Sequence, residues 1–109
     1  MEIGPIAEVV FDLSYTEDKM GARVYLPERE QTSEDWSCSF EIDGPISVRR
    51  TIFGVSSLQA LMLALKTMAA YLYGSDLYKR GELGIYGRFG GSLSIPAPKE
   101  MLDIAPYPF

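Results

Sequence analysis

The feature that most constrains the fold is the segment of residues 54–74, which is apolar on nearly every side. It has a single charged residue, Lys66, in 21 residues. Apolar side chains recur in it at helical spacing: Leu58, Leu61, Met62, Leu65, Met68, Ala69 and Leu72. This spacing predicts a helix whose apolar face packs on the core. Ser56 and Gln59 form a capping box at its start, and Gly74 is expected in the C′ position after its end.

A second stripe on the same helix is richer in small side chains. Its members are Ala60, Leu63, Ala64, Thr67 and Tyr71. A single sheet can cover only one face of a helix, so this stripe needs a different cover. We expect it to meet the C-terminal tail, a second copy of the chain in a homodimer, or a ligand.

Alternating apolar residues predict an antiparallel sheet. The clearest strand is residues 36–42, in which every second side chain from Trp36 to Ile42 is apolar. Further strands are expected at residues 6–15, 22–26 and 46–53, with a short hairpin formed by residues 83–86 and 92–95. The pattern predicts an α+β fold in a single domain of residues 1–109. Its antiparallel β-sheet would have four to six strands, with one long central α-helix packed on one face.

The side-chain inventory restricts the chemistry of the chain. It contains no histidine and a single cysteine, Cys38. No metal site, cofactor site or catalytic residue is therefore predicted, and the chain is not expected to be an enzyme. Cys38 lies on the apolar face of its strand, which predicts a buried and unreactive thiol. An alternative is a small ligand pocket formed by Asp76, Tyr78 and Glu82.

Charge is distributed unevenly along the sequence. Residues 1–43 hold eleven acidic and three basic residues, a net charge of −8, whereas residues 44–109 hold four acidic and seven basic residues, a net charge of +3. A surface of this kind does not favour nucleic acid, which requires a basic stripe. It favours a basic protein partner, because opposite charges steer association. The candidate partner-binding residues are Glu17, Asp18, Glu28, Glu30, Glu34 and Asp35.

Two functions follow from these observations. The first is a small acidic protein-binding module that acts through an acidic face. The alternative is a homo-oligomeric structural module that assembles through the small-residue stripe or the C-terminal tail. Residues 1–10 lack the basic start of a secretory signal, and Lys66 would be costly inside a bilayer, so we expect a cytoplasmic protein that does not enter the membrane.

Two segments together resemble a family of small uncharacterised bacterial proteins, a domain of unknown function. Residues 36–42 match its W-x-C-x-[FY]-x-I strand, and residues 54–61 match its G-x-[DS]-S-x-Q-A-L helix start, with Ser56 where such proteins often have Asp. Both motifs are structural, so the resemblance implies a fold and no active site. The size, charge and layout of the chain are also similar to those of immunity proteins that inhibit toxins.

Overall fold

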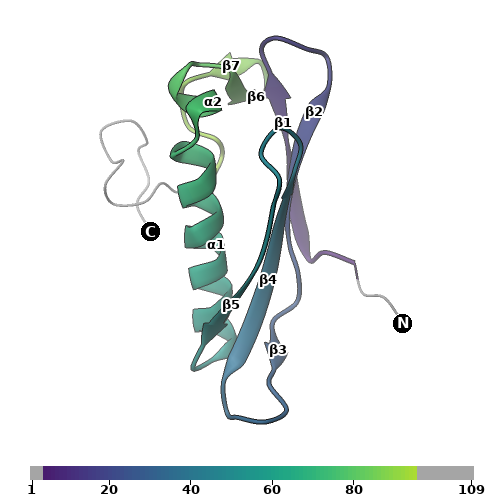
Figure 1. Cartoon of the computed structure of the whole chain (residues 1–109), viewed down its shortest axis with the longest axis vertical. Coiled ribbons are helices and arrows are strands. Elements are labelled where there is room, and N and C mark those ends of the chain that lie inside the picture. The colour runs from purple at the N-terminus through teal and green to yellow at the C-terminus, as the bar shows by residue number, and fades with distance from the viewer. Residues whose placement is uncertain (1–3, 96–109) are drawn as a thin grey trace.

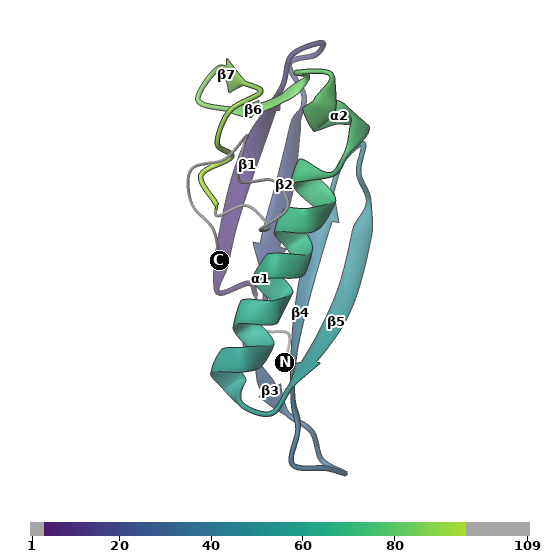
Figure 2. The ribbon, with the colours of Figure 1, turned by 90° about the vertical axis from the view of Figure 1, so that its left-hand side faces the viewer.

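The computed structural model describes residues 4–95 and consists of two layers, an antiparallel sheet and a long helix against one of its faces (Figures 1 and 2). The predicted α+β fold is therefore confirmed. The predicted packing of the C-terminal tail, residues 96–109, falls outside the described residues. The elements in chain order are β1 (Ala7–Leu13), β2 (Lys19–Val24), β3 (Glu28–Arg29), β4 (Trp36–Asp43), β5 (Val48–Gly54), α1 (Ser57–Tyr73), α2 (Asp76–Lys79), β6 (Leu83–Ile85) and β7 (Arg88–Phe89).

The sheet has seven strands, and β4 pairs with three of them. The order of neighbours is β3-β4-β2-β1-β6-β7, and β5 also pairs with β4. Phe40 of β4 lies opposite Val24 of β2 and opposite Arg50 of β5, so β2 and β5 flank β4 on its two sides. The sheet has more strands than predicted because β3 and β7, of two residues each, are too short to show an alternating pattern.

The face of the sheet away from α1 carries a row of alternating charges, and Val10 and Phe53 are also exposed on it. Glu8, Arg23, Glu41 and Arg49 lie directly opposite one another on four adjacent strands. Arg23 donates to Glu41 and lies 3.9 Å from Glu8, and Arg49 lies 3.8 Å from Glu41. Cross-strand pairs of opposite charge stabilise a sheet modestly.

Both ends of α1 are capped, the first of them as predicted. The Gln59 amide donates to Ser56 Oγ at 3.0 Å, and the Gln59 side chain accepts from the Val55 amide at 2.7 Å. Gly74 is the C-cap with a φ of −82°, so the predicted C′ position for Gly74 was wrong. A left-handed glycine is not needed to end α1, because the next residue, Ser75, already caps the start of α2.

The first half of α1 turns a different face to the sheet from the one predicted. Ala60 and Ala64 are fully buried, whereas Leu58 and Met62 are 64% and 47% exposed. The cause is the close approach of β5 to the helix start. A Cβ atom at Gly54 would lie 2.6 Å from the Ala60 backbone nitrogen, so only small side chains fit beneath this turn.

The small-residue stripe proposed as an oligomer interface is consequently divided. Ala60 and Ala64 belong to the core and offer no surface to another subunit. Tyr71 is half-buried against the Phe40 ring, with centroids 6.1 Å apart. Leu63 is exposed, and Thr67 is half-buried with its hydroxyl bonded to the Leu63 carbonyl oxygen.

The hairpin near the end of the described chain was predicted with the wrong second strand. β6 pairs with β7 through a two-residue turn at Tyr86-Gly87, in which both residues have positive φ. Residues 92–95 form no strand with β6 and instead pass over the core, with Leu93 fully buried. No helix in the part of the chain that the structure describes is long and apolar enough to cross a membrane.

Candidate protein-binding surface

The first half of α1 and the loop before it leave large apolar side chains in solvent. We call these four residues the helix patch: Val55, Leu58, Met62 and Leu63. Val55 is the most exposed of them, at 74%. A shallow apolar hollow of about 310 Å³ runs along the same helix surface, between Ser56 and Lys66. Clustered apolar exposure of this kind is a mark of interaction sites, whereas single exposed residues are ordinary.

Four of the six candidate acidic residues lie together at the same end of the molecule. We call them the acidic loop: Glu28, Glu30, Glu34 and Asp35, from β3 and the β3–β4 connection. The loop closes through a backbone bond of 2.9 Å from the Glu30 amide to the Asp35 carbonyl oxygen. Glu30 is half-buried and the other three are exposed. The acidic loop is thus a defined turn whose carboxylates face solvent.

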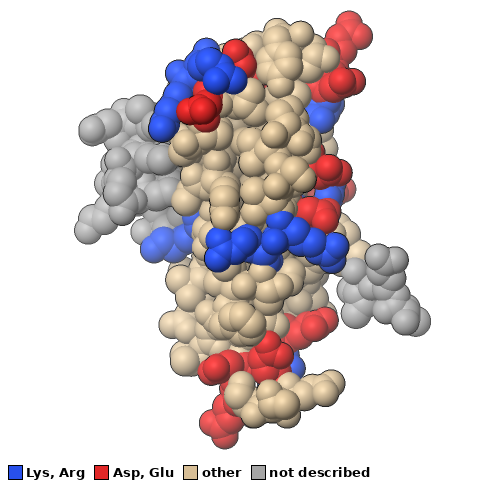
Figure 3. Space-filling model, viewed as in Figure 1, with Lys and Arg blue, Asp and Glu red and all other residues tan. Residues whose placement is uncertain are grey.

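The strand register brings the acidic loop next to the start of α1. Trp36 pairs with Arg29 on one side and with Gly54 on the other, and Gly54 leads into the helix patch. In Figure 3 the acidic side chains at the lower end border the uncharged surface over the first half of α1. The helix patch is therefore bordered on one side by the acidic loop.

Glu17 and Asp18 lie in the β1–β2 turn, at the opposite end of the sheet from the acidic loop (Figure 1). Figure 3 shows acidic side chains at both ends of the long axis and a band of basic side chains between them. The exposed Arg49 and Arg50 of β5 lie between the two ends of the sheet. The six acidic residues therefore lie in two separate loops at opposite ends of the sheet, and only the four of the acidic loop lie near the helix patch.

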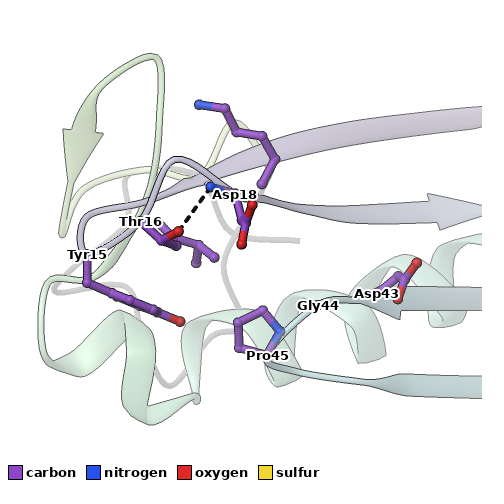
Figure 4. Close-up of a pocket in the computed structure, with 8 residues that line it drawn as sticks. Tyr15, Thr16, Asp18, Asp43, Gly44 and Pro45 are labelled. Carbon is purple, nitrogen blue, oxygen red and sulfur yellow. Dashed lines mark hydrogen bonds between the residues drawn. The ribbon is translucent and has the colours of Figure 1, made fainter.

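A shallow hollow of about 550 Å³ lies beside the β1–β2 turn. Figure 4 shows Tyr15 pointing across it toward Pro45, with Asp18 and Asp43 on different elements. The Asp18 amide donates to Thr16 Oγ1 at 3.2 Å, which fixes the turn. Because Asp18 and Asp43 do not converge in Figure 4, the hollow lacks the paired carboxylates that most glycoside hydrolases use.

Within residues 4–95, no group of three or more metal-ligating side chains is close enough to hold a metal ion. Two residues of the alternative ligand pocket are engaged within the fold. The Tyr78 side chain is buried and its hydroxyl donates to the Gly91 carbonyl oxygen at 2.9 Å, while Glu82 binds Arg80. Burial also raises the pKa of the Cys38 thiol, as expected for an unreactive cysteine.

The comparisons with known proteins place the chain in a family. A family model described as "Domain of unknown function (DUF6968)" matches residues 7–97, which include every strand and helix of the structure. Neither the curated proteins nor the solved structures contained a match to the chain. The match spans most of the sequence, and no function is assigned to the family. The chain belongs to the DUF6968 family.

Proposed function

We propose that this protein is a non-catalytic binding module that docks a protein partner on the helix patch. The observation that carries the proposal is that Leu58, Met62 and Leu63 are exposed along one hollow of α1, with Val55 exposed in the loop just before the helix. These residues contribute little to the core, because Ala60 and Ala64 occupy the buried side of the same turns. A few buried residues supply most of the binding energy in protein interfaces, and clustered exposed apolar side chains mark where such interfaces form.

The partner that fits this surface has an apolar anchor flanked by basic residues. The acidic loop borders the helix patch and would attract such a partner through its carboxylates. Charge complementarity of this type raises the association rate and weakens as salt is added. An inhibitor that covers a basic protein, as immunity proteins do, is one module of this kind.

A capture experiment tests the proposal with two baits that change different parts of the surface. Leu58→Gln combined with Met62→Gln removes the apolar anchor and keeps good helix formers. Glu28→Gln, Glu30→Gln, Glu34→Gln and Asp35→Asn together neutralise the acidic loop. Ala70→Gln, on the exposed side of the second half of α1, is the control for the first bait, and Glu17→Gln with Asp18→Asn is the control for the second.

We expect a basic partner that binds the wild type and both controls. The helix-patch variant should weaken binding by about tenfold or more. The acidic-loop variant should lower the association rate and reduce its dependence on salt. Equal binding by all five proteins would refute the proposal.

The second candidate function is that of a structural module that forms a homodimer through the same helix patch. The observation that favours it is that Leu58, Met62 and Leu63 form an exposed helix face that a two-fold axis could bury against its own copy. Sedimentation velocity from low to high micromolar concentration separates the two functions. A dimer that Leu58→Gln and Met62→Gln abolish would support self-association, and a monomer throughout would exclude it.

A further inference from the structure

A third hollow lies between the β6–β7 turn and the loop that follows β7. Figure 1 shows these segments at the opposite end of α1 from the helix patch. Its volume is about 530 Å³, within the range of small-molecule sites. It is lined by Ile85, Tyr86, Arg88, Gly91, Ser92 and Ser94. None of these residues belongs to the helix patch or to the acidic loop, so this hollow is independent of the function proposed above.

The backbone strain of the described chain is concentrated in this hollow. Among residues 4–95 only two non-glycine residues have positive φ, Tyr86 at 53° and Ser94 at 71°, and both line it. Such conformations cost energy and persist where the surrounding structure enforces them, often at functional sites. The Tyr86 side chain is 86% exposed, so the strain is not compensated by burial of the ring.

The turn that presents Tyr86 is held rigidly. Asp12 of β1 accepts a hydrogen bond of 2.9 Å from the Gly87 amide with one carboxylate oxygen and binds Lys19 with the other. These two contacts lower the pKa of Asp12, the Lys19 contact being the larger cause. Gly84 allows the hairpin to close, because a Cβ atom there would lie 2.0 Å from the Arg88 carbonyl oxygen.

Two buried tyrosines hold the segment of residues 91–95, which forms the opposite wall of the hollow. Tyr73 and Tyr78 pack edge to face, with ring centroids 5.0 Å apart. The Tyr73 hydroxyl accepts from the Leu93 amide at 2.9 Å and donates to the Ile95 carbonyl oxygen at 2.7 Å. With the Tyr78–Gly91 bond, these contacts hold the backbone of residues 91–95 in place before any ligand arrives.

The side chains of the hollow suit an oxyanion. Arg88 forms no ion pair with any carboxylate among the described residues, whereas Arg80, at the end of α2, binds Glu82. A guanidinium offers a planar fork of donors to carboxylate or phosphate oxygens. The Ser92 and Ser94 hydroxyls add donors on the other wall, and the Asp12 charge behind the turn is neutralised by Lys19.

We propose that this hollow binds a small ligand that carries a phosphate or carboxylate group next to a flat ring. Arg88 holds the oxyanion, with help from the Ser92 and Ser94 hydroxyls. Tyr86 covers the ring from the edge of the hollow, which accounts for a strained and exposed aromatic side chain at this turn. The rigid walls reduce the entropy that binding would otherwise cost.

Amide chemical shifts of the full-length protein test the site directly. Inorganic phosphate and sodium acetate are titrated separately at constant ionic strength, and the probe that saturates at the lower concentration identifies the oxyanion. Saturable shifts are expected at the amides of Gly91, Ser92 and Ser94. Arg88→Gln should weaken binding about tenfold, and Arg88→Lys should recover only part of it. Arg80→Gln, the matched control, should bind as the wild type does.

Two results would overturn the proposal. One is the absence of saturable shifts with either probe, and the other is equal binding by the wild type and Arg88→Gln. Tyr86 is tested with phenyl phosphate, which should bind more tightly than inorganic phosphate. Tyr86→Asn creates an Asn-Gly turn suited to positive φ. It should raise the melting temperature and abolish the preference for phenyl phosphate; a lower melting temperature with the preference intact would contradict the role of Tyr86.

Discussion

The two halves of α1 use large and small side chains in opposite ways. In the first half Ala60 and Ala64 face the sheet, and Leu58 and Met62 face solvent. In the second half the large side chains of Met68, Leu72 and Tyr73 are buried, and the exposed residues are Lys66 and Ala70. The second half therefore has the composition expected of a helix that stabilises a core. The first half has the composition expected of a helix that also offers a surface.

The largest expected effect comes from the second half. Leu72 is fully buried, and Leu72→Ala should lower the free energy of unfolding by about 2–5 kcal/mol, since it loses apolar contacts and leaves a cavity. Urea denaturation followed by circular dichroism measures this change. Met62→Ala is the matched control in the first half and should cost far less. Equal losses for the two variants would remove the distinction between the halves.

The next effect tests the close packing of the first half. Ala64→Leu places a large side chain where the helix lies against the sheet, and we expect a loss of about 1–3 kcal/mol in the free energy of unfolding. The same substitution at the exposed Ala70 should leave the free energy of unfolding nearly unchanged. A neutral Ala64→Leu variant would mean that the helix can move away from β4 and β5 at little cost.

A smaller effect concerns the link between α1 and the loop after β7. Tyr73→Phe keeps the ring but leaves the buried Leu93 amide without its acceptor. The expected loss is about 1–2 kcal/mol, because an unsatisfied buried donor retains its desolvation cost. Amide hydrogen exchange at Leu93 should also become faster. Unchanged exchange would show that water or another group replaces the phenol.

These differences along α1 explain which parts of the structure the sequence could predict. The strand that begins at Trp36 and the cap formed by Ser56 and Gln59 depend on residues close in sequence, and both were predicted correctly. The inward face of the first helical turns was not, because it depends on how closely β5 approaches at Gly54. Apolar periodicity records which side chains are hydrophobic, and it does not record how much space lies beneath them.

The candidate sites show the same limit. Asp18 and Glu28 are ten residues apart in sequence, yet β2 runs the length of the sheet between them and places them at opposite ends. The turn of the last hairpin was predicted between residues 86 and 92 and lies at Tyr86-Gly87, because a tyrosine in the left-handed region is rare and Tyr86 was assigned to the strand. In both cases the position of a residue depends on the tertiary structure, which the local sequence does not reveal.

The smallest effect on stability is expected from the helix patch itself. Leu58→Gln with Met62→Gln replaces two exposed side chains by a residue of similar helix propensity, so the free energy of unfolding should change by no more than about 0.5 kcal/mol. Urea denaturation of the variant and the wild type side by side gives the difference.

A loss of several kcal/mol would show that these side chains stabilise the fold and would remove the reason to assign them to a partner. A neutral result combined with lost binding would separate stability from function within one helix. The second half of α1 would then stabilise the fold, and the exposed side chains of the first half would serve binding without contributing to stability.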